Sequence, residues 1–303
     1  MALAIAFSAY GGPEVLHPID IDPPAPGTGQ LRVRVKAAGV NPVDVKLRRG
    51  DFAVTMPADF PQRLGNEYAG VVDQVGDGVA GLATGDEVLG STTAQGYAEY
   101  VVVDAADTVH KPASMPWTVA AGLPAVGQTA YTALRQIGVH PGDTVLIHAA
   151  AGGVGTVAVQ LGRLWGATVI GTASEHNHDY LRSLGATPVS YGPGLVDRIR
   201  LLAPDGVDAV LDAVGGEAIA ASLALVPDRH RIGTLVDARA VSEHGILRVG
   251  GRSTAALRQL VTLYDQGRLQ IPIHATFPLS QADRAHLEVQ TRHVRGKVVL
   301  TVA

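Results

Sequence analysis

A glycine-rich segment between two apolar runs does most to constrain the fold of this chain. The segment is Ala149–Gly155, with glycine at positions 152, 153 and 155; it follows the apolar run Thr144–His148 and precedes the run Val157–Leu164. This order predicts a strand, a tight turn and a helix that can bind a dinucleotide pyrophosphate. Small residues let the backbone approach the phosphates, and the helix N-terminus offers N–H groups with partial positive charge. A tight turn without a ligand is the alternative, but such a turn does not need three glycines in four positions.

The composition is that of a globular protein with a large core. Of 303 residues, 47% are hydrophobic and 17% are charged, and this length suits two domains better than one. The net charge is −4, and no run of basic residues is longer than Arg48–Arg49. We therefore expect neither a nucleic acid nor an anionic membrane as a partner.

The chain has no cysteine, which excludes disulfides, thiolate zinc sites, iron–sulfur clusters and cysteine nucleophiles. This absence is compatible with a reducing compartment, and we expect a cytoplasmic protein. The apolar N-terminus Met1–Phe7 lacks a basic segment and is followed by Gly11–Pro13, so it is predicted to be a first strand and not a signal peptide. No apolar run approaches the length of a membrane span.

Residues 1 to about 113 are predicted to form a small β-barrel with little helix. Leu31, Val33 and Val35 alternate with basic residues, as in a half-buried strand. Tyr68–Val72 and Tyr100–Val103 are further strand candidates, and glycine and proline residues separate these segments.

Near Pro116 the pattern changes to helices and then to alternating strands and helices, which predicts a parallel sheet covered by helices on both faces. The tail from Leu269 is β-like again and is expected to return to the first domain. The predicted helices are Trp117–Leu123, Gly127–Ile137, Val154–Trp165, Asn177–Leu184, Glu217–Leu225 and Ala255–Tyr264, and the predicted strands are Thr144–His148, Thr168–Thr172, Val207–Leu211, Arg231–Val236 and Ile246–Val249.

Short motifs spread over nearly the whole chain occur in a fixed order. They are Ala38–Asp44, Gly65–Gly70, Gly85–Val88, Gly96–Tyr100, Gly127–Ala130, Ala149–Gly155, Leu184–Ala186, Asp212–Gly216 and Gly296–Leu300. With these motifs the chain resembles the medium-chain dehydrogenase/reductase superfamily, and most of all its zinc-independent quinone oxidoreductase branch, which includes zeta-crystallin.

The resemblance implies an α/β fold with two domains and a cleft between them. A Rossmann domain with a doubly wound parallel sheet would span residues 122–264 and bind NADP. A GroES-like β-barrel catalytic domain would span residues 1–121 and 265–303. The resemblance also implies a homodimer, often joined through edge strands of the cofactor domains, and Ile246–Val249 would be that edge here.

The departures from zinc-dependent relatives predict a metal-free enzyme. Those relatives carry a cysteine and a histidine where this chain has Asn41 and Asn66, and asparagine amides are poor zinc ligands. His176 and His178 would face apart on a helix, so no metal site is expected. Without a metal to polarise a carbonyl, a quinone or an α,β-unsaturated carbonyl is an easier acceptor than a simple ketone, because the arriving charge spreads over the conjugated system.

NADPH is the expected cofactor. The second Rossmann strand, Thr168–Thr172, runs into Ser174 without an acid at its tip, although Glu175 follows. A small hydroxyl residue there suits a 2′-phosphate, which a carboxylate would repel. The resemblance assigns this pocket to Ser174, the basic position at His176, and Tyr191.

His176 is a departure, because relatives commonly carry Arg or Lys at this position. A neutral imidazole attracts phosphate less than Arg or Lys does, so we expect weaker discrimination against NADH. We also expect NADPH to bind more tightly as the pH falls. A solvated loop histidine is the alternative.

Other cofactor residues follow from the glycine turn and from the resemblance. Gly152, Gly153 and Val154 should face the pyrophosphate. The resemblance places Thr129 near the nicotinamide, Val214 and Val236 along the cofactor, and Lys297 near the cofactor cleft; a solvated strand lysine is the alternative for Lys297.

Asn41, Asp44 and Lys46 are the candidates for catalysis. Asn41, also counted among the cofactor-side residues, can donate an amide N–H to a substrate carbonyl. Lys46 could donate a proton or stabilise an enolate if it points inward. For Asp44 we favour a structural cap on the following turn, Val45–Arg49. The loop Arg49–Phe52 has no tyrosine, so a tyrosine acid is not expected and water could supply the proton.

These observations favour an NADPH-dependent reductase of quinones or enones. An enoyl-thioester reductase is a close alternative, because its cofactor domain looks similar. An NADPH-binding sensor or structural protein without turnover is an alternative from another class. The acidic charge balance disfavours the RNA binding known for some relatives.

Overall fold

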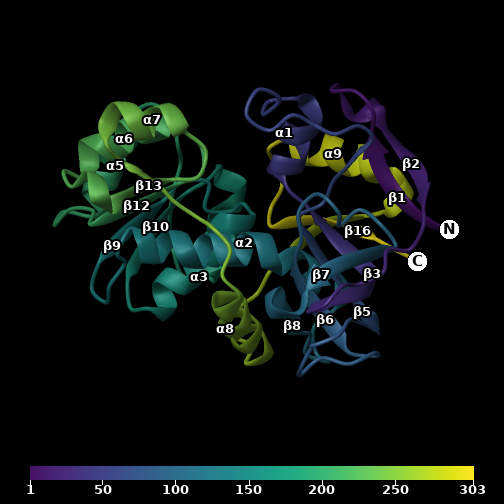
Figure 1. The fold of residues 1–303 in the computed structure, drawn as a ribbon. Helices are drawn as coiled ribbons and strands as arrows, with labels where there is room; N and C mark the ends of the chain where they lie inside the picture. Colours follow the sequence, from purple (N-terminus) through teal and green to yellow (C-terminus); the bar gives the residue numbers. More distant parts are fainter. The chain divides into compact units, whose positions relative to one another are not determined.

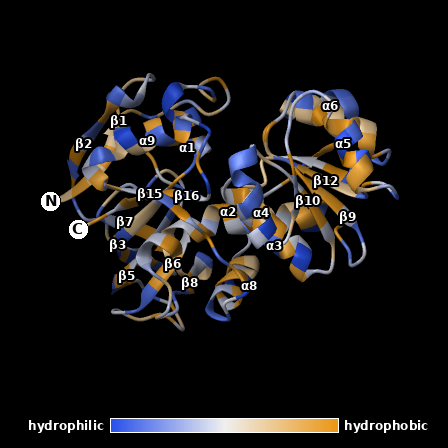
Figure 2. Cartoon of the chain, turned by 180° about the vertical axis from the view of Figure 1, so that it is seen from behind, coloured by the Kyte–Doolittle hydropathy of each residue, from blue (hydrophilic) through white to orange (hydrophobic).

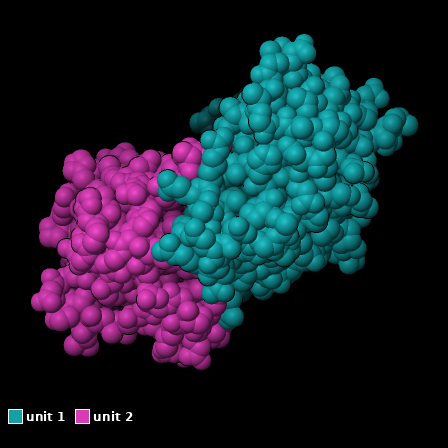
Figure 3. Space-filling view, turned by 90° about the horizontal axis from the view of Figure 1, so that it is seen from below, with its two compact units in different colours: residues 1–125, 257–303 teal, residues 126–256 magenta.

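The computed structural model describes residues 1–303, which form two compact units (Figure 3). Unit 1 comprises Met1–Ala125 and Leu257–Ala303, and unit 2 comprises Val126–Ala256. Both boundaries lie inside helices, α2 (Trp117–Gln136) and α8 (Thr254–Asp265), whereas the predicted domains met at residues 121/122 and 264/265.

Unit 1 is built mainly of β-strands (Figure 1). A seven-stranded sheet has the order β15-β16-β3-β5-β6-β8, with β7 also paired to β3, and a three-stranded sheet has the order β2-β1-β4. The elements are β1 (Ala2–Phe7), β2 (Leu16–Ile21), β3 (Gln30–Val40), α1 (Pro42–Arg49), β4 (Gln62–Arg63), β5 (Glu67–Val75), β6 (Glu87–Ser91), β7 (Tyr100–Asp104), β8 (Thr108–His110), β15 (Ile273–Pro278), α9 (Ala282–Gln290) and β16 (Lys297–Thr301).

The core of unit 1 explains why these segments are strands. Leu31, Val33 and Val35 of β3 are fully buried, whereas the basic residues between them face outward, as the alternation predicts. Strand β16 pairs antiparallel with β3, with Val298 opposite Val40. The C-terminal tail therefore returns to the first domain, as expected.

Unit 2 is a parallel sheet with the strand order β11-β10-β9-β12-β13-β14. In Figure 2 the central strands β9, β10 and β12 are largely coloured as hydrophobic, as expected for strands covered on both faces. The strands are β9 (Thr144–Ile147), β10 (Thr168–Thr172), β11 (Thr187–Val189), β12 (Ala209–Asp212), β13 (Ile232–Thr234) and β14 (Leu247–Arg248), and the helices are α3 (Gly153–Leu164), α4 (His178–Ser183), α5 (Leu195–Leu202), α6 (Glu217–Leu225) and α7 (Ala238–His244).

This strand order fixes where a ligand can bind in unit 2. The chain passes from β9 to β10 on one side of the sheet and later to β12 on the other side of β9. The order reverses between β9 and β12, and ligands of such sheets bind at the carboxyl ends of the strands beside this reversal. The glycine turn leaves the carboxyl end of β9.

Two sequence predictions need correction, and two helices were not predicted. The helices predicted as Trp117–Leu123 and Gly127–Ile137 are one helix, α2, which continues through Pro124 because its apolar residues on both sides of the proline are buried. The strand predicted at Ile246–Val249 pairs over two residues only. Helices α5 and α7 were not predicted, because both are short and amphipathic over only two turns. No helix combines the length and apolar character needed to cross a bilayer.

Candidate cofactor and active site

The turn from β9 into α3 presents backbone N–H groups at the start of a helix. Gly152 is the N-cap residue, α3 begins at Gly153, and the first N–H bonded inside the helix is that of Thr156, which donates to the Gly152 carbonyl at 2.8 Å. The preceding N–H groups, from Gly153 to Gly155, lie in the first turn, where no intrahelical acceptor exists. This turn can bind an anion, because its dipole and its N–H groups both favour negative charge.

Close packing of α3 against the preceding turn requires glycine at position 155. A Cβ atom at this position would collide with the carbonyl oxygen of Ala149 and lie 2.6 Å from the Cα atom of Ala150. At Gly152 the nearest atom to an added Cβ is 3.4 Å away. Gly155 therefore lets α3 approach β9 closely, while Gly152 lies at the half-exposed mouth of the turn.

Three predicted cofactor residues expose apolar side chains after the sheet strands of unit 2. Tyr191 is 62% exposed, Val214 58% and Val236 38%; they follow β11, β12 and β13. Thr129 is half-buried on the part of α2 that belongs to unit 2. Large apolar side chains exposed along the ligand-binding edge of such a sheet gain from covering by a bound molecule.

Asp212, at the end of β12, fixes the two loops that carry Val214 and Val236. Its buried carboxylate accepts the N–H groups of Val214 at 2.9 Å and Gly215 at 3.0 Å, and the hydroxyl of Thr234 at 2.6 Å. The Thr234 oxygen in turn accepts the N–H of Val236 at 3.2 Å. Asp212 belongs to a motif in the sequence but was not predicted to have this role. The sequence signal for it is an acid at the end of a buried strand, shortly before Gly215 and Gly216.

The structure brings Ser174 and His176 together just beyond β10. The Ser174 hydroxyl lies 3.3 Å from Nε2 of His176, and the Asn177 amide donates to the same hydroxyl at 3.2 Å. The imidazole and the Glu175 carboxylate are both exposed, so both side chains can act on a group bound there.

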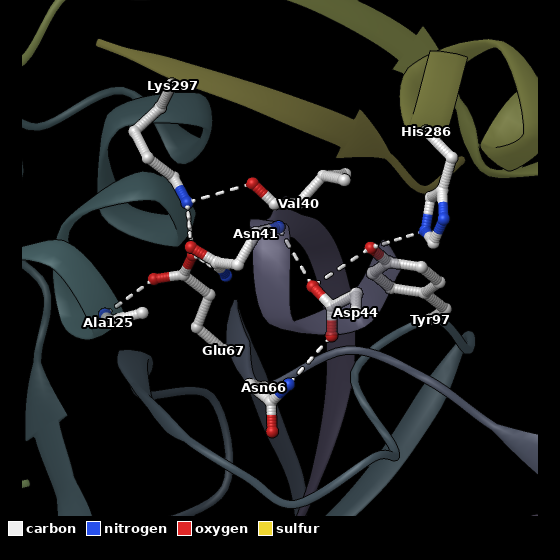
Figure 4. Close-up of polar contacts among 9 residues, drawn as sticks. All are labelled: Val40, Asn41, Asp44, Asn66, Glu67, Tyr97, Ala125, His286 and Lys297. Carbon is white, nitrogen blue, oxygen red and sulfur yellow. Dashed lines mark hydrogen bonds and ion pairs between the residues drawn. The ribbon is translucent and has the colours of Figure 1, made fainter. Parts of the chain in front are cut away.

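In unit 1, Lys297 lies in a buried polar cluster (Figure 4). Its ammonium donates to Glu67 at 2.7 Å, to the amide oxygen of Asn41 at 2.6 Å and to the Val40 carbonyl at 3.1 Å. With the side chain 3% exposed, the alternative of a solvated strand lysine is wrong. All three N–H groups have acceptors within unit 1, so this geometry gives Lys297 no donor for a cofactor.

The carboxylate of Glu67, like the ammonium of Lys297, has several hydrogen-bond partners. Besides Lys297 it accepts the amide N–H of Asn41 at 2.8 Å and the backbone N–H of Ala125 at 2.7 Å. Ala125 follows Pro124, whose missing N–H interrupts the hydrogen-bond ladder of α2. A Cβ atom on Gly39 would collide with the Glu67 carboxylate, so the glycine of this motif makes room for the ion pair.

Asp44 is fully buried in the same cluster. Its carboxylate accepts the backbone N–H of Asn41 at 2.9 Å, the amide of Asn66 at 2.7 Å and the hydroxyl of Tyr97 at 3.3 Å. Burial raises the pKa of Asp44 to about 6, against the opposing effects of the Asn41 N–H and the Lys297 charge. Asp44 does have a capping role, but the helix begins at Pro42 and Asn41 is the N-cap, so Asp44 closes a capping box from within α1.

The cluster continues through Tyr97 to α9. The Tyr97 oxygen lies 3.2 Å from Nε2 of His286, and burial together with the Arg48 charge lowers the pKa of His286 to about 3. Arg48 is fully buried and donates from Nη2 to Gln290 at 2.8 Å. Sequence reasoning missed Tyr97, His286 and Arg48, because their roles depend on pairing across elements far apart in the chain.

Of the predicted catalytic residues, Asn41 and Asp44 lie together and Lys46 does not join them. Asn41 is 6% exposed and both ends of its amide are bonded inside the cluster. Lys46 is half-buried on α1 and forms no ion pair.

Comparisons with known proteins identify the family of this chain. Residues 27–113 match the alcohol dehydrogenase GroES-like domain, and residues 184–300 match the zinc-binding dehydrogenase family. The chain is 35% identical to a quinone oxidoreductase of Pseudomonas aeruginosa over 99% of both chains. It therefore belongs to the medium-chain dehydrogenase/reductase family.

Two solved structures of this family are also similar. The Escherichia coli quinone oxidoreductase complexed with NADPH is 29% identical, with a TM-score of 0.87 over 99% of this chain and 100% of that chain. The CurK enoyl reductase is 27% identical, with a TM-score of 0.89 over 100% of this chain and 99% of that chain. The medium-chain dehydrogenase/reductase fold and the oxidoreductase class of the chain are therefore established.

The zinc named in one matching family does not fit this member. Asn41 and Asn66 occupy the two ligand positions, and each donates its amide to a carboxylate, Glu67 and Asp44 respectively. No group of three His, Cys, Asp or Glu side chains is placed to hold a metal ion. We assign no step to zinc.

Proposed function

We propose that this protein is a zinc-independent, NADPH-dependent oxidoreductase that reduces quinones or α,β-unsaturated carbonyls. The observation that carries the proposal is the first turn of α3, whose N–H groups lie at the reversal of strand order, at the sheet edge after which Val214 and Val236 are also exposed. The similarity to two quinone oxidoreductases supports the substrate class.

The residues of unit 2 fit a bound NADPH. Gly152, Gly153 and Val154 would hold the pyrophosphate by backbone N–H groups. Ser174, His176 and Tyr191 would surround the 2′-phosphate. Thr129, Val214 and Val236 would lie along the rest of the cofactor. When bound, NADPH supplies the hydride.

Unit 1 would bind and stabilise the acceptor. Its fully buried charges balance, Asp44 and Glu67 against Arg48 and Lys297, so a developing negative charge on the acceptor meets no net negative field. Neutral amide donors held by this cluster can then stabilise the enolate or hydroquinone anion. Lys46 or water would deliver the proton that completes the reduction.

Turnover of NADPH against a panel of quinones, enones, alkenals and enoyl thioesters tests this function. We expect oxidation of NADPH with at least one conjugated acceptor and none with simple ketones. Tight NADPH binding without oxidation by any acceptor would instead favour the sensor or structural alternative. Stoichiometric zinc in the purified protein would contradict the metal-free mechanism.

An enoyl-thioester reductase is the second candidate, because the chain is also similar to the CurK enoyl reductase. In that reaction the hydride adds to the β-carbon of the thioester and a proton adds to the α-carbon. Crotonyl thioester compared with a small quinone in the same assay separates the two candidates.

We further propose a cytoplasmic homodimer joined through β14. This strand is the outer strand of the unit 2 sheet and pairs over only two residues, Leu247 and Arg248. Its unpaired edge can extend the sheet into a second copy. Analytical ultracentrifugation measures the mass, and proline at position 247 should favour the monomer.

A further inference from the structure

We propose that Arg198 is a positioning residue of the cofactor site, and that it holds the loop of residues 190–193 so that Tyr191 contacts the 2′-phosphate of NADPH. The inference rests on the proposed function, which supplies this contact of Tyr191. Arg198 itself would not touch the cofactor. Because NADH has no 2′-phosphate, a residue that acts through this loop affects the binding of NADPH and not that of NADH.

The loop of residues 190–193 leaves the sheet of unit 2 beside the segment that carries Ser174. Strands β10 and β11 are parallel neighbours, with Thr172 opposite Val189. Ser174 and Tyr191 each follow this pair by two residues. Adjacent strands lie about 4.8 Å apart. The two residues therefore start from neighbouring points at the carboxyl edge of the sheet, where the 2′-phosphate is proposed to bind.

The backbone of this loop has few hydrogen bonds to hold it. The carbonyls of Ser190, Tyr191 and Pro193 accept no backbone N–H. Gly192 and Gly194 both have positive φ, 92° and 76°, and glycine restricts its own backbone less than any other residue. The side chain of Tyr191 is 62% exposed. Contacts from outside the loop must therefore fix its conformation.

The guanidinium of Arg198, on α5, supplies these contacts. Its Nη2 donates to the Ser190 carbonyl at 2.8 Å, and its Nη1 donates to the Pro193 carbonyl at 2.8 Å. The carbonyls of Tyr191 and Gly192 each lie 3.4 Å from Nη2. A guanidinium is planar, and its donors have a fixed fork geometry. One rigid group therefore spans all four residues of the loop, including the backbone on both sides of Tyr191.

The partners of Arg198 make a positioning role separable from a purely electrostatic one. All four are neutral carbonyls, and no carboxylate pairs with Arg198, whereas Arg200 of the same helix lies 3.8 Å from the Asp197 carboxylate. The charge of Arg198 would favour a nearby anion whatever the conformation of the loop. A lysine would keep this charge, but its single ammonium cannot span the Ser190 and Pro193 carbonyls.

Calorimetric titration of the full-length protein with NADPH and with NADH tests the positioning role. We expect Arg198→Met to raise the dissociation constant of NADPH about tenfold, as loss of a hydrogen bond to a charged group does, and to leave that of NADH within about twofold. Tyr191→Ala should show the same pattern. The double variant should bind NADPH no more weakly than the weaker single variant, because both changes remove the same contact.

Two further variants serve as controls. Arg198→Lys keeps the charge and the aliphatic stem but loses the fork, and we expect it to bind NADPH more weakly than the wild-type protein does. If Arg198→Met does not fold, Arg198→Lys takes its place in the comparison with Tyr191→Ala. Arg200→Met removes an exposed positive charge from the same helix and should leave both dissociation constants unchanged.

Several results overturn the inference alone while the wild-type protein prefers NADPH to NADH. An Arg198→Met variant that binds NADPH within about twofold of wild type contradicts any role of this residue in the site. Equal weakening of NADPH and NADH would show a general loss of structure in unit 2. Wild-type affinity in Arg198→Lys would show that charge alone is sufficient, and independent, multiplying effects with Tyr191→Ala would show that Tyr191 is not the residue positioned. A wild-type protein that binds neither cofactor overturns the proposed function, and the inference falls with it.

Discussion

The ammonium of Lys297 lies 2.7 Å from the carboxylate of Glu67, and the two side chains are 3% and 0% exposed. They come from β16 and β5, which are not neighbours, because β3 lies between them in the sheet. The pair crosses β3 at Gly39, where a side chain would collide with Glu67. Three motifs far apart in the sequence therefore depend on one buried ion pair.

Breaking this pair from one side should destabilise the protein strongly. Lys297→Met leaves the Glu67 carboxylate buried without its counter-charge, and we expect a loss of about 3–5 kcal/mol in the free energy of unfolding. The double variant Lys297→Met with Glu67→Gln should lose less free energy of unfolding than the sum of the losses of the two single variants.

Chemical denaturation followed by the fluorescence of Trp117, in unit 1, measures the loss of stability. Arg182→Met, from an exposed pair with Asp179, is the control and should change stability by less than about 1 kcal/mol. If Lys297→Met instead weakened NADPH binding and left stability unchanged, Lys297 would be a cofactor-binding residue and not a structural one.

Alanine at the two glycine positions of the α3 turn should separate folding from binding. Gly155→Ala forces a Cβ atom against Ala149 and Ala150, so we expect a loss of about 1–3 kcal/mol in stability and weak NADPH binding. Gly152→Ala meets no close atom and should fold normally. Thermal unfolding and calorimetric titration with NADPH compare the two variants. Equal stability of both would show that α3 does not need the close approach to β9.

Much of the fold could be predicted from local patterns. The alternation at Leu31, Val33 and Val35 identified β3, and the glycine turn with its flanking runs identified β9 and α3. These patterns were sufficient because the spacing of apolar residues within each segment indicates its secondary structure and its buried face. Helix α2 was divided at Pro124 because a proline ordinarily ends a helix, and only the packing of its two halves reveals that it continues.

The candidate site was less accessible to sequence reasoning. Asn41 and Asp44 were found because they share one motif, and the structure does bring them together. The roles of Glu67, Tyr97 and His286 arise from contacts between β5, the segment before β7, and α9, and no local pattern encodes these contacts. For the same reason Lys297 was expected either near the cofactor or at the surface. A single lysine in a strand gives no local signal that it pairs with a buried carboxylate.

Replacing His176 should change the preference between the two cofactors. An imidazole beside Ser174 attracts a bound 2′-phosphate less than a fixed positive charge would. His176→Arg should therefore tighten NADPH binding, because arginine stays charged, and it should leave NADH binding unchanged. Calorimetry with both cofactors measures this, and Glu175→Gln is a companion variant that should also favour NADPH. Equal affinities for NADPH and NADH from pH 6 to 8 would contradict the assignment of this pocket.

His148 should make unit 2 sensitive to acid. Its ring is buried at the end of β9, between the hydroxyls of Thr172 and Ser222, and burial lowers its pKa from 6.5 to about 4, against the opposing charge of Asp212. In the unfolded chain the ring takes up a proton below pH 6.5, whereas in the folded chain it stays neutral down to about pH 4. The free energy of unfolding therefore decreases as the pH falls from 6.5 towards 4, by about 2 kcal/mol at pH 5.

The variant His148→Gln should remove this loss of stability. Denaturation between pH 7 and 5, followed by Trp165 in unit 2, measures it apart from Asp44 of unit 1, whose raised pKa acts with the opposite sign. An unchanged acid sensitivity in His148→Gln would mean that another group, and not this histidine, binds the proton on unfolding.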